Sequence, residues 1–208
     1  MSTYNHNHNH NNHGGSTENF MAKIEFLDSA MRQRTLPPEE ILHMLPIQKE
    51  VSVLDLGAGS GYLTIPVAKQ TEGTVFALDM DGRMLQVIDK KAKAQNISNI
   101  QLIEGNIEDI PLPDNSVNIA IASLILHEVS SLSVVFTEIN RVLKTGGHLL
   151  CLEYEKKESS EEGPPIHIRI PSVDMEQTLY VAGFEVEQKA IPKGPIYILT
   201  AKKIGGTE

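Results

Sequence analysis

Val-Leu-Asp-Leu-Gly-Ala-Gly-Ser-Gly-Tyr-Leu-Thr, residues 53–64, decides the fold of this chain. An apolar strand leads directly into glycines at positions 57, 59 and 61, and a stretch compatible with a helix follows. Glycine lets a ligand approach the backbone closely because no Cβ stands in the way. The spacing is G-x-G-x-G, whereas a dinucleotide-binding turn has G-x-G-x-x-G and a P-loop ends in Gly-Lys-Ser/Thr. The turn therefore indicates a nucleoside ligand without a pyrophosphate.

A second apolar strand, residues 74–79, ends in an acid, Asp79. In a nucleotide-binding α/β unit, a carboxylate at the tip of the second strand accepts hydrogen bonds from the ribose hydroxyls. We therefore expect Asp79 to bind a ribose. The alternative role for Asp79 is to cap the following helix, although Asp81 is better placed for that.

Strand and helix patterns alternate from residue 37 onward, which predicts an α/β fold with a mostly parallel sheet and helices on both faces. The expected helices begin near Pro37, follow the glycine turn to residue 69, and span 81–94, 133–143 and 172–182. The expected strands are 51–56, 74–79, 100–104, 117–122, 148–154, 184–190 and 196–201. The last two strands flank a Pro-Lys-Gly-Pro turn, so we expect an antiparallel terminal hairpin on a Rossmann-like, seven-stranded sheet.

With these motifs, the chain resembles the class I S-adenosylmethionine-dependent methyltransferases, in particular their small branch related to ubiquinone and menaquinone biosynthesis. The resemblance rests on residues 53–64, Asp79, Gly105-Asn106-Ile107 and the terminal hairpin, and it covers residues 34–201. It implies S-adenosylmethionine as the cofactor. It also implies an enzyme that transfers a methyl group to a small molecule, which the sequence does not identify.

The resemblance further implies how the cofactor is held. Asp55 would face its cationic amino end, Met80 would flank the adenine ring, and Asn106 would meet the adenine amino group. Asn106 departs from the commoner Gly-Asp pattern of the family, and Asp55 has the alternative role of capping loop amides. The expected cofactor-binding residues are Asp55, Gly57, Ala58, Gly59, Gly61, Tyr62, Asp79, Met80, Met84, Asn106, Ile107 and Ser123.

His127 is the candidate catalytic residue. It lies in the segment 123–129, which in the resembling family passes beside the transferable methyl group and the acceptor. The unperturbed pKa of histidine is near neutrality, so His127 would serve as a general base if the acceptor must lose a proton. The alternative is a structural histidine in a loop. Methyl transfer from a sulfonium requires no metal, and we expect no metal site.

Two other functions stay open on the sequence alone. A nicotinamide-dependent oxidoreductase would share the strand–glycine–helix–acid pattern, although the glycine spacing and the lack of a clear Tyr/Lys or Cys/His set argue against it. A non-catalytic module that binds S-adenosylmethionine would share every cofactor motif.

Composition sets further expectations. Residues 1–19 are rich in alternating Asn and His, and we interpret them as a disordered expression tag ahead of one methyltransferase domain, 20–208. The net charge of −9 disfavours nucleic acid or a membrane surface as a partner. No long apolar run and no signal peptide are visible, so we expect a cytoplasmic monomer or homodimer with a small-molecule substrate.

Two further segments carry expectations. Cys151 lies in an apolar stretch and is expected to be a buried strand residue and not a nucleophile. Residues 155–171 form the one irregular stretch, which fits either a mobile surface loop or a lid over the substrate. Arg32 and Arg34 precede the first expected helix and would either meet an anionic substrate or be solvated.

Overall fold

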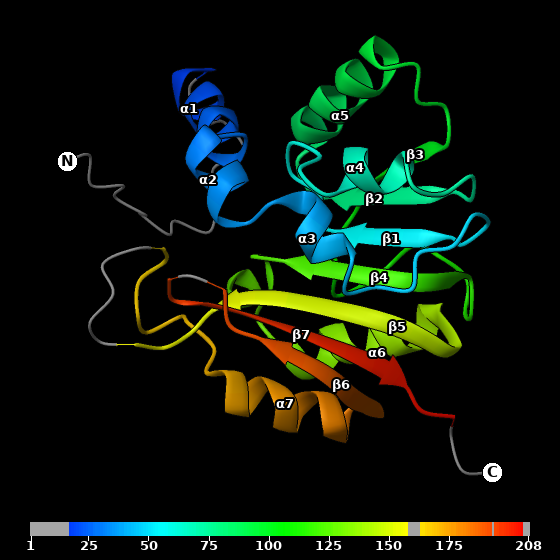
Figure 1. Ribbon diagram of the computed structural model, residues 1–208, viewed down its shortest axis with the longest axis vertical. Coiled ribbons are helices and arrows are strands. Elements are labelled where there is room, and N and C mark those ends of the chain that lie inside the picture. The colour runs from blue at the N-terminus through cyan, green and yellow to red at the C-terminus, as the bar shows by residue number, and fades with distance from the viewer. Residues whose placement is uncertain (1–16, 158–162, 193, 206–208) are drawn as a thin grey trace.

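A computed structural model of the protein describes residues 17–157, 163–192 and 194–205. Within these ranges, seven strands form one sheet in the order β3-β2-β1-β4-β5-β7-β6 (Figure 1). Strands β1 to β5 are parallel, and β7 runs antiparallel to both β5 and β6. The strands are β1 (Val53–Leu56), β2 (Val75–Asp79), β3 (Ile100–Glu104), β4 (Val117–Ser123), β5 (Leu143–Tyr154), β6 (Phe184–Ala190) and β7 (Ile196–Lys203). The predicted Rossmann-like fold is confirmed.

Helices cover both faces of the sheet, because side chains along each strand point alternately to the two sides. Val53, Ile119 and Leu150 pack toward α3 (Pro38–Leu42) and α4 (Thr64–Ala68). The neighbouring residues Leu54 and Leu149 pack toward the opposite helices, α6 (Leu132–Val142) and α7 (Ser172–Val181). Helix α5 (Gly82–Ala94) lies against β2 on the α4 side. With both faces covered, the central strands are apolar throughout, as is usual for parallel sheets.

Two helices at the start of the described chain were not expected from the sequence. They are α1 (Thr17–Leu27) and α2 (Ala30–Thr35), and neither contains a buried residue. Helix α2 is capped by Ser29, whose hydroxyl accepts the Arg32 N–H at 3.2 Å. Most of the expected tag, residues 1–16, lies outside the described residues, and residues 17–19 form the first turn of α1.

The start of β5 differs from the expectation. The strand begins at Leu143 instead of residue 148, and the Lys-Thr-Gly-Gly sequence, a signal for the end of the preceding helix, lies inside it. Leu143 pairs with Val117 and His148 pairs with Ile119, so residues 144–147 bulge out of the ladder. The glycines thus serve a β-bulge, in which a positive φ such as that of Gly146 is common.

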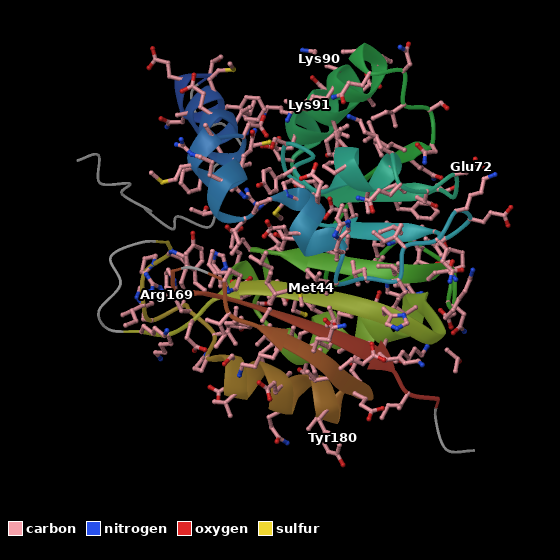
Figure 2. All side chains as sticks on the ribbon, viewed as in Figure 1. Met44, Glu72, Lys90, Lys91, Arg169 and Tyr180 are labelled. Carbon is pink, nitrogen blue, oxygen red and sulfur yellow. The ribbon has the colours of Figure 1, made fainter. Side chains whose placement is uncertain are left out.

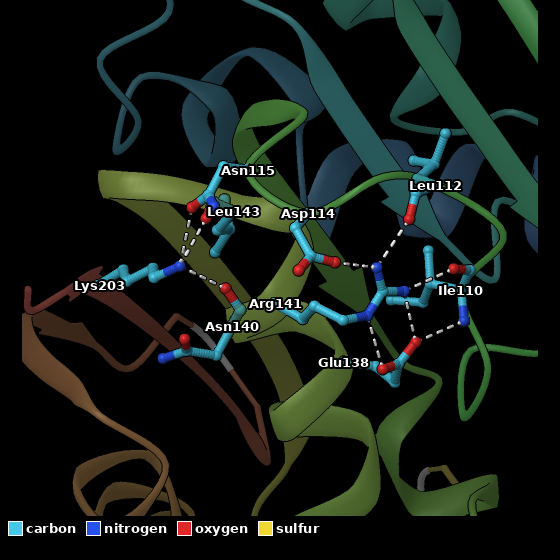
Figure 3. A network of polar contacts seen from close by, with 9 residues as sticks. All are labelled: Ile110, Leu112, Asp114, Asn115, Glu138, Asn140, Arg141, Leu143 and Lys203. Atoms are coloured by element: carbon cyan, nitrogen blue, oxygen red, sulfur yellow. Dashed lines mark hydrogen bonds and ion pairs between the residues drawn. The ribbon is translucent and has the colours of Figure 1, made fainter. Parts of the chain in front are cut away.

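The Arg141 guanidinium holds residues 110–114 of the loop between β3 and β4 (Figure 3). Arg141 of α6 donates to the carbonyls of Ile110 at 2.7 Å and Leu112 at 2.8 Å, and it pairs with Asp114 at 2.8 Å. Glu138 binds the same guanidinium at 2.7 Å and also accepts the Ile110 N–H at 2.9 Å. This loop also carries residues 105–107, so α6 fixes part of the expected cofactor site.

Cys151 lies in the middle of β5 and is fully buried. Burial raises the pKa of its thiol, which keeps the sulfur protonated and unreactive. The prediction of a core residue is confirmed. In the part of the chain that the structure describes, no helix has the length and apolar character needed to cross a membrane.

Candidate active site

Most of the expected site residues lie at the carboxyl ends of the parallel strands β1 to β4, on either side of the boundary between β1 and β4. The strand order reverses at this point, with β2 and β3 on one side and β5 on the other. In open α/β sheets, ligands bind in the crevice at such a switch point. The glycine loop follows β1, the His127 segment follows β4, and α1 and α2 stand beside this edge of the sheet (Figure 1).

The glycine loop adopts a conformation that only glycine takes without strain. Gly57, Gly59 and Gly61 have φ values of 64°, 54° and 85°. A Cβ on Gly57 would lie 2.5 Å from Cγ1 of Ile125, which is far inside van der Waals contact. Ala58, which lies between Gly57 and Gly59, is buried. Both backbone conformation and packing therefore require the glycines that the sequence singled out.

Asp79 lies at the end of β2 and fixes the glycine loop. Its Oδ2 accepts the Gly59 N–H at 2.7 Å, and its Oδ1 accepts the Asp81 N–H at 2.9 Å. Asp81 itself caps α5 through the Arg83 N–H, as the sequence indicated. A carboxylate has about four acceptor positions, so Asp79 retains capacity for two hydroxyl donors.

Asp55 is a buried acid beside the same loop. It is 3% exposed, and its Oδ2 accepts the Thr64 hydroxyl at 2.6 Å. Burial raises the pKa of Asp55 to about 7, against the lowering effects of Thr64 and of the Arg32 charge. Thr64, the first residue of α4, is thus its hydrogen-bond partner through the hydroxyl and also through the backbone, which agrees with the capping role considered above. A carboxyl group with such a pKa is partly protonated near neutral pH, and a cation or donor beside it favours the charged form.

The N-terminal helices are attached to the glycine loop. Asp28, between α1 and α2, accepts the Ser60 hydroxyl at 2.7 Å and pairs with Lys91 at 2.7 Å. Lys91 lies on the side of α5 that faces α1 (Figure 2) and also donates to the Ser60 carbonyl at 2.7 Å. Leu27 lies against Gly59, because a Cβ there would be 3.3 Å from the leucine Cδ1. These contacts place α1 and α2 directly over the loop.

Arg32 reaches into this region from α2. Its guanidinium lies 4.2 Å from the ring centre of Tyr62, whose hydroxyl donates to the Leu36 carbonyl at 2.6 Å. The Arg32 Nε is buried without a hydrogen-bond partner, and burial lowers the pKa of the group. Tyr62, which was expected to contact the cofactor, thus packs against the guanidinium of Arg32. The sequence had left open whether Arg32 meets a substrate or is solvated.

The remaining expected cofactor residues differ in exposure. Met80 is 66% exposed after β2, whereas Met84 on α5 is fully buried. Asn106 is exposed and its Oδ1 accepts the Glu108 N–H at 2.9 Å, while Ile107 is buried. The hydroxyl of Ser123, at the end of β4, is buried without a partner. Their contacts with a cofactor stay predictions.

His127 lies in η1 (Leu126–Glu128), which follows β4, and it pairs with an acid that the sequence analysis missed. Its Nδ1 is 2.8 Å from Oε2 of Glu153, a fully buried residue of β5. Burial lowers the pKa of His127, but the hydrogen bond and the charges of Glu153 and Glu128 outweigh it and raise the pKa above its ordinary value. An acid inside the apolar strand 148–154 was the signal that could have revealed the pair.

Two hollows on the described surface lie away from these residues. One is lined by α7 and β6 side chains, including Tyr180 and Val186, and the other by α6 and the Glu108 loop. Neither hollow is lined by a set of buried polar groups like the one at the ends of β1 and β4. The candidate site is therefore the set of residues at that edge of the sheet. No group of three or more His, Cys, Asp or Glu suited to a metal occurs among the described residues.

The residues at this edge fit S-adenosylmethionine. Asp79 offers free acceptor positions beside a loop without Cβ atoms, which suits ribose hydroxyls. Ser123 and Arg32 each carry a buried polar atom without a partner, and such atoms usually find one in a ligand or water. Asp55 is a buried acid whose charge a cationic ammonium group would stabilise.

Comparison with known proteins points the same way. Residues 47–192 match the family described as a methyltransferase domain. The demethylmenaquinone methyltransferase of Geobacillus stearothermophilus is 33% identical over 140 residues, which cover 65% of this chain and 60% of that relative. The chain therefore matches less than two thirds of that relative's length.

Solved structures share the fold. A SAM-dependent methyltransferase from Aquifex aeolicus has a TM-score of 0.81 and 25% identity, covering 88% of this chain and 98% of that one. The [4+2]-cyclase SpnF has a TM-score of 0.73 and 21% identity, covering 81% of each chain. The second likeness concerns the fold alone, because one fold carries several chemistries.

Proposed function

We propose a function on the premise that the chain belongs to the methyltransferase-domain family, to which residues 47–192 match. This membership confirms the resemblance to the class I S-adenosylmethionine-dependent methyltransferases of the menaquinone-related branch, and with it the cofactor. The proposed function is methyl transfer from S-adenosylmethionine to a small-molecule acceptor. The observation that carries it is the Asp79 carboxylate, held by the Gly59 and Asp81 amides beside the glycine loop.

The proposed roles follow from the contacts. Asp79 binds the ribose hydroxyls, Asp55 pairs with the ammonium group, and the glycine loop admits the nucleoside closely. The 105–107 loop, which Arg141 fixes through residues 110–114, borders the adenine. When bound, S-adenosylmethionine supplies an electrophilic methyl group: the acceptor's electron pair forms the new bond, and the sulfur keeps the pair of the broken bond. The chain's contribution is orientation and exclusion of water, which supply several kcal/mol of such a barrier.

The acceptor is proposed by chemical class. The relatives that match over about half or more of their length are named for demethylmenaquinone, a quinone whose reduced form carries O–H groups. An acceptor of that kind suits a site bordered by η1 and the N-terminal helices. We therefore choose demethylmenaquinone as the first acceptor to be tried.

Calorimetric titration with S-adenosylhomocysteine tests the cofactor site. We expect micromolar binding by the wild type and a loss of at least about tenfold in Asp79→Ala, since two hydrogen bonds to the ribose disappear. Asp89→Ala is the matched control, because Asp89 makes only a surface pair with Lys93 on α5. NADH in the same titration tests the oxidoreductase alternative.

Asp79→Ala also removes the partner of the Gly59 amide, so its folding must be checked. Asp79→Asn keeps one acceptor oxygen for that amide and serves as the second variant. Thermal unfolding of both variants is measured beside the titration. Binding of S-adenosylhomocysteine with equal affinity by wild type and folded Asp79 variants would overturn the proposed ribose contact.

A further inference from the structure

Four donors converge on the buried carboxylate of Glu153. Its Oε1 accepts the Leu126 N–H at 2.8 Å and, more weakly, the His127 N–H at 3.4 Å. Its Oε2 meets the His127 Nδ1 at 2.8 Å and the Tyr154 N–H at 3.3 Å. Glu153 is completely buried, and a buried carboxylate requires such donors.

This arrangement fixes which ring nitrogen of His127 carries the proton. The other three donors are backbone amides, so the carboxylate faces Nδ1 as an acceptor and Nδ1 must be the protonated nitrogen. In neutral imidazole the second nitrogen, Nε2, then has a free lone pair. The Nε2 accepts no hydrogen bond from the described residues, and Oε1 of Glu128 lies 3.9 Å from it.

The segment that carries His127 is itself held in an unusual conformation. Leu124, the first residue after β4, has a φ of 56°, which is rare and strained for a bulky side chain. Its N–H donates to the Leu152 carbonyl at 2.8 Å, next to Glu153 on β5. Strand β5 therefore holds the backbone of this segment at Leu124 and Leu126, and the ring of His127 as well.

We propose that Glu153 is a positioning residue that keeps the proton of His127 on Nδ1, so that Nε2 takes a proton from the methyl acceptor. The inference rests on the proposed function and deepens it. The acceptor must then carry an acidic O–H or comparable proton, which leaves as the new bond forms and resides on Nε2. A thioether or tertiary amine acceptor has no such proton and would not use this pair.

Nuclear magnetic resonance of the ring nitrogens tests the positioning role without any acceptor. In the ¹⁵N-histidine-labelled wild type we expect His127 to titrate above its ordinary pKa of about 6.5 and to be Nδ1-protonated when neutral. In Glu153→Gln, one amide oxygen can still accept the Leu126 N–H, but the amide NH₂ then faces Nδ1. We expect the neutral tautomer to change to Nε2-protonated and the pKa to fall.

Glu128→Gln is the matched control for this measurement. It removes the carboxylate 3.9 Å from Nε2 but leaves the Nδ1 partner in place. We expect its tautomer to stay that of the wild type, with a smaller fall in the pKa of His127. An Nε2-protonated ring in the wild type, or the same tautomer in wild type and Glu153→Gln, would overturn the proposal.

Kinetics test the use of Nε2. With S-adenosylmethionine and chemically reduced demethylmenaquinone as the trial acceptor, we expect Glu153→Gln to lower kcat about 100-fold or more, the usual contribution of a general base. Its affinity for S-adenosylhomocysteine should stay within about twofold, which separates this loss from a loss of the cofactor site. His127→Ala with and without Glu153→Gln should have equal activity, because one residue acts through the other.

Each outcome has a distinct meaning. Additive losses in the double variant would overturn the action of Glu153 through His127. Wild-type binding of S-adenosylhomocysteine without turnover of this acceptor would contradict the chosen acceptor only, and the tautomer measurement would still decide the role of Glu153. Failure to bind S-adenosylhomocysteine would overturn the proposed function itself.

Discussion

The affinity for the cofactor product should depend on pH through Asp55. Burial raises the pKa of this carboxyl to about 7 in the protein alone. An ammonium group placed beside it favours the ionised form and lowers that pKa. Binding is therefore weak where Asp55 is protonated, strengthens as pH rises, and reaches a plateau above about pH 8.

The size of the effect follows from the titration of one group. With a pKa of about 7, only about 3% of Asp55 is ionised at about pH 5.5, and about 97% at about pH 8.5. If the bound form keeps Asp55 ionised throughout, the dissociation constant falls about 30-fold between these limits. At about pH 6, binding should release about 0.9 proton per molecule.

Titration calorimetry with S-adenosylhomocysteine measures both quantities. The pH series gives the dissociation constants, and two buffers of different ionisation enthalpy give the protons released. Asp55→Asn is the control, because it keeps the size of the side chain and removes the ionisation. A flat affinity with no buffer-dependent heat in the wild type, or an unchanged slope in Asp55→Asn, would refute the pairing of Asp55 with the ammonium group.

The raised pKa of Asp55 has the opposite effect on folding stability, which falls as pH rises. Asp55 has a pKa of about 7 in the folded chain and an ordinary pKa of 3.8, so the folded state favours its protonated form. Its contribution to stability is complete below about pH 4 and is lost as pH rises to about 7. A bound ammonium group would reverse that loss, so S-adenosylhomocysteine should stabilise the chain more at pH 8 than at pH 6.

Three further changes test the scaffold of the site. Gly57→Ala should lower the free energy of unfolding, measured in urea, by about 2–4 kcal/mol, because of strain at positive φ and the clash with Ile125. The control Gly146→Ala has a positive φ but no clash, so its free energy of unfolding should fall by only about 1–2 kcal/mol. Equal losses in the two variants would contradict the packing argument. Asp28→Ala should cost about 1 kcal/mol and speed hydrogen exchange in residues 17–35, and unchanged exchange there would show that these helices are held by other contacts. Arg141→Lys should cost about 1–2 kcal/mol and increase proteolysis of the 105–116 loop, because an ammonium group cannot reproduce the forked contacts; wild-type resistance to protease would argue against this role.

The elements with regular local signals were predictable from the sequence. Apolar strands, the glycine turn and the Asp81 cap are each encoded within a few residues, and the structure has all three. The start of β5 was misplaced because a Lys-Thr-Gly-Gly stretch is compatible with either the end of a helix or a bulge in a strand. Only pairing with β4 distinguishes these, and that pairing is not a local property.

Long-range contacts account for the other omissions. Helix α1 begins inside the stretch interpreted as a tag, and α2 has only six residues, so neither helix was recognised from the sequence. Their position depends on Asp28 meeting Ser60 and Lys91, which are distant in sequence. The pairing of His127 with Glu153 likewise requires the register of β4 against β5. The sequence identified His127 as a candidate base, but not the acid beside it.

The buried thiol of Cys151 can be used to measure how often the core around the sheet opens. The chain has one cysteine, and it lies between Ala122 of β4 and Leu199 of β7 at the centre of the sheet. A thiol reagent reacts only with an accessible thiolate, so labelling requires separation of the sheet from α6 and α7, the helices that pack on the same face as Cys151. The labelling rate therefore gives the free energy of that separation directly in the unmodified protein. A ligand bound across β1 and β4 should slow the labelling by the factor that its affinity dictates.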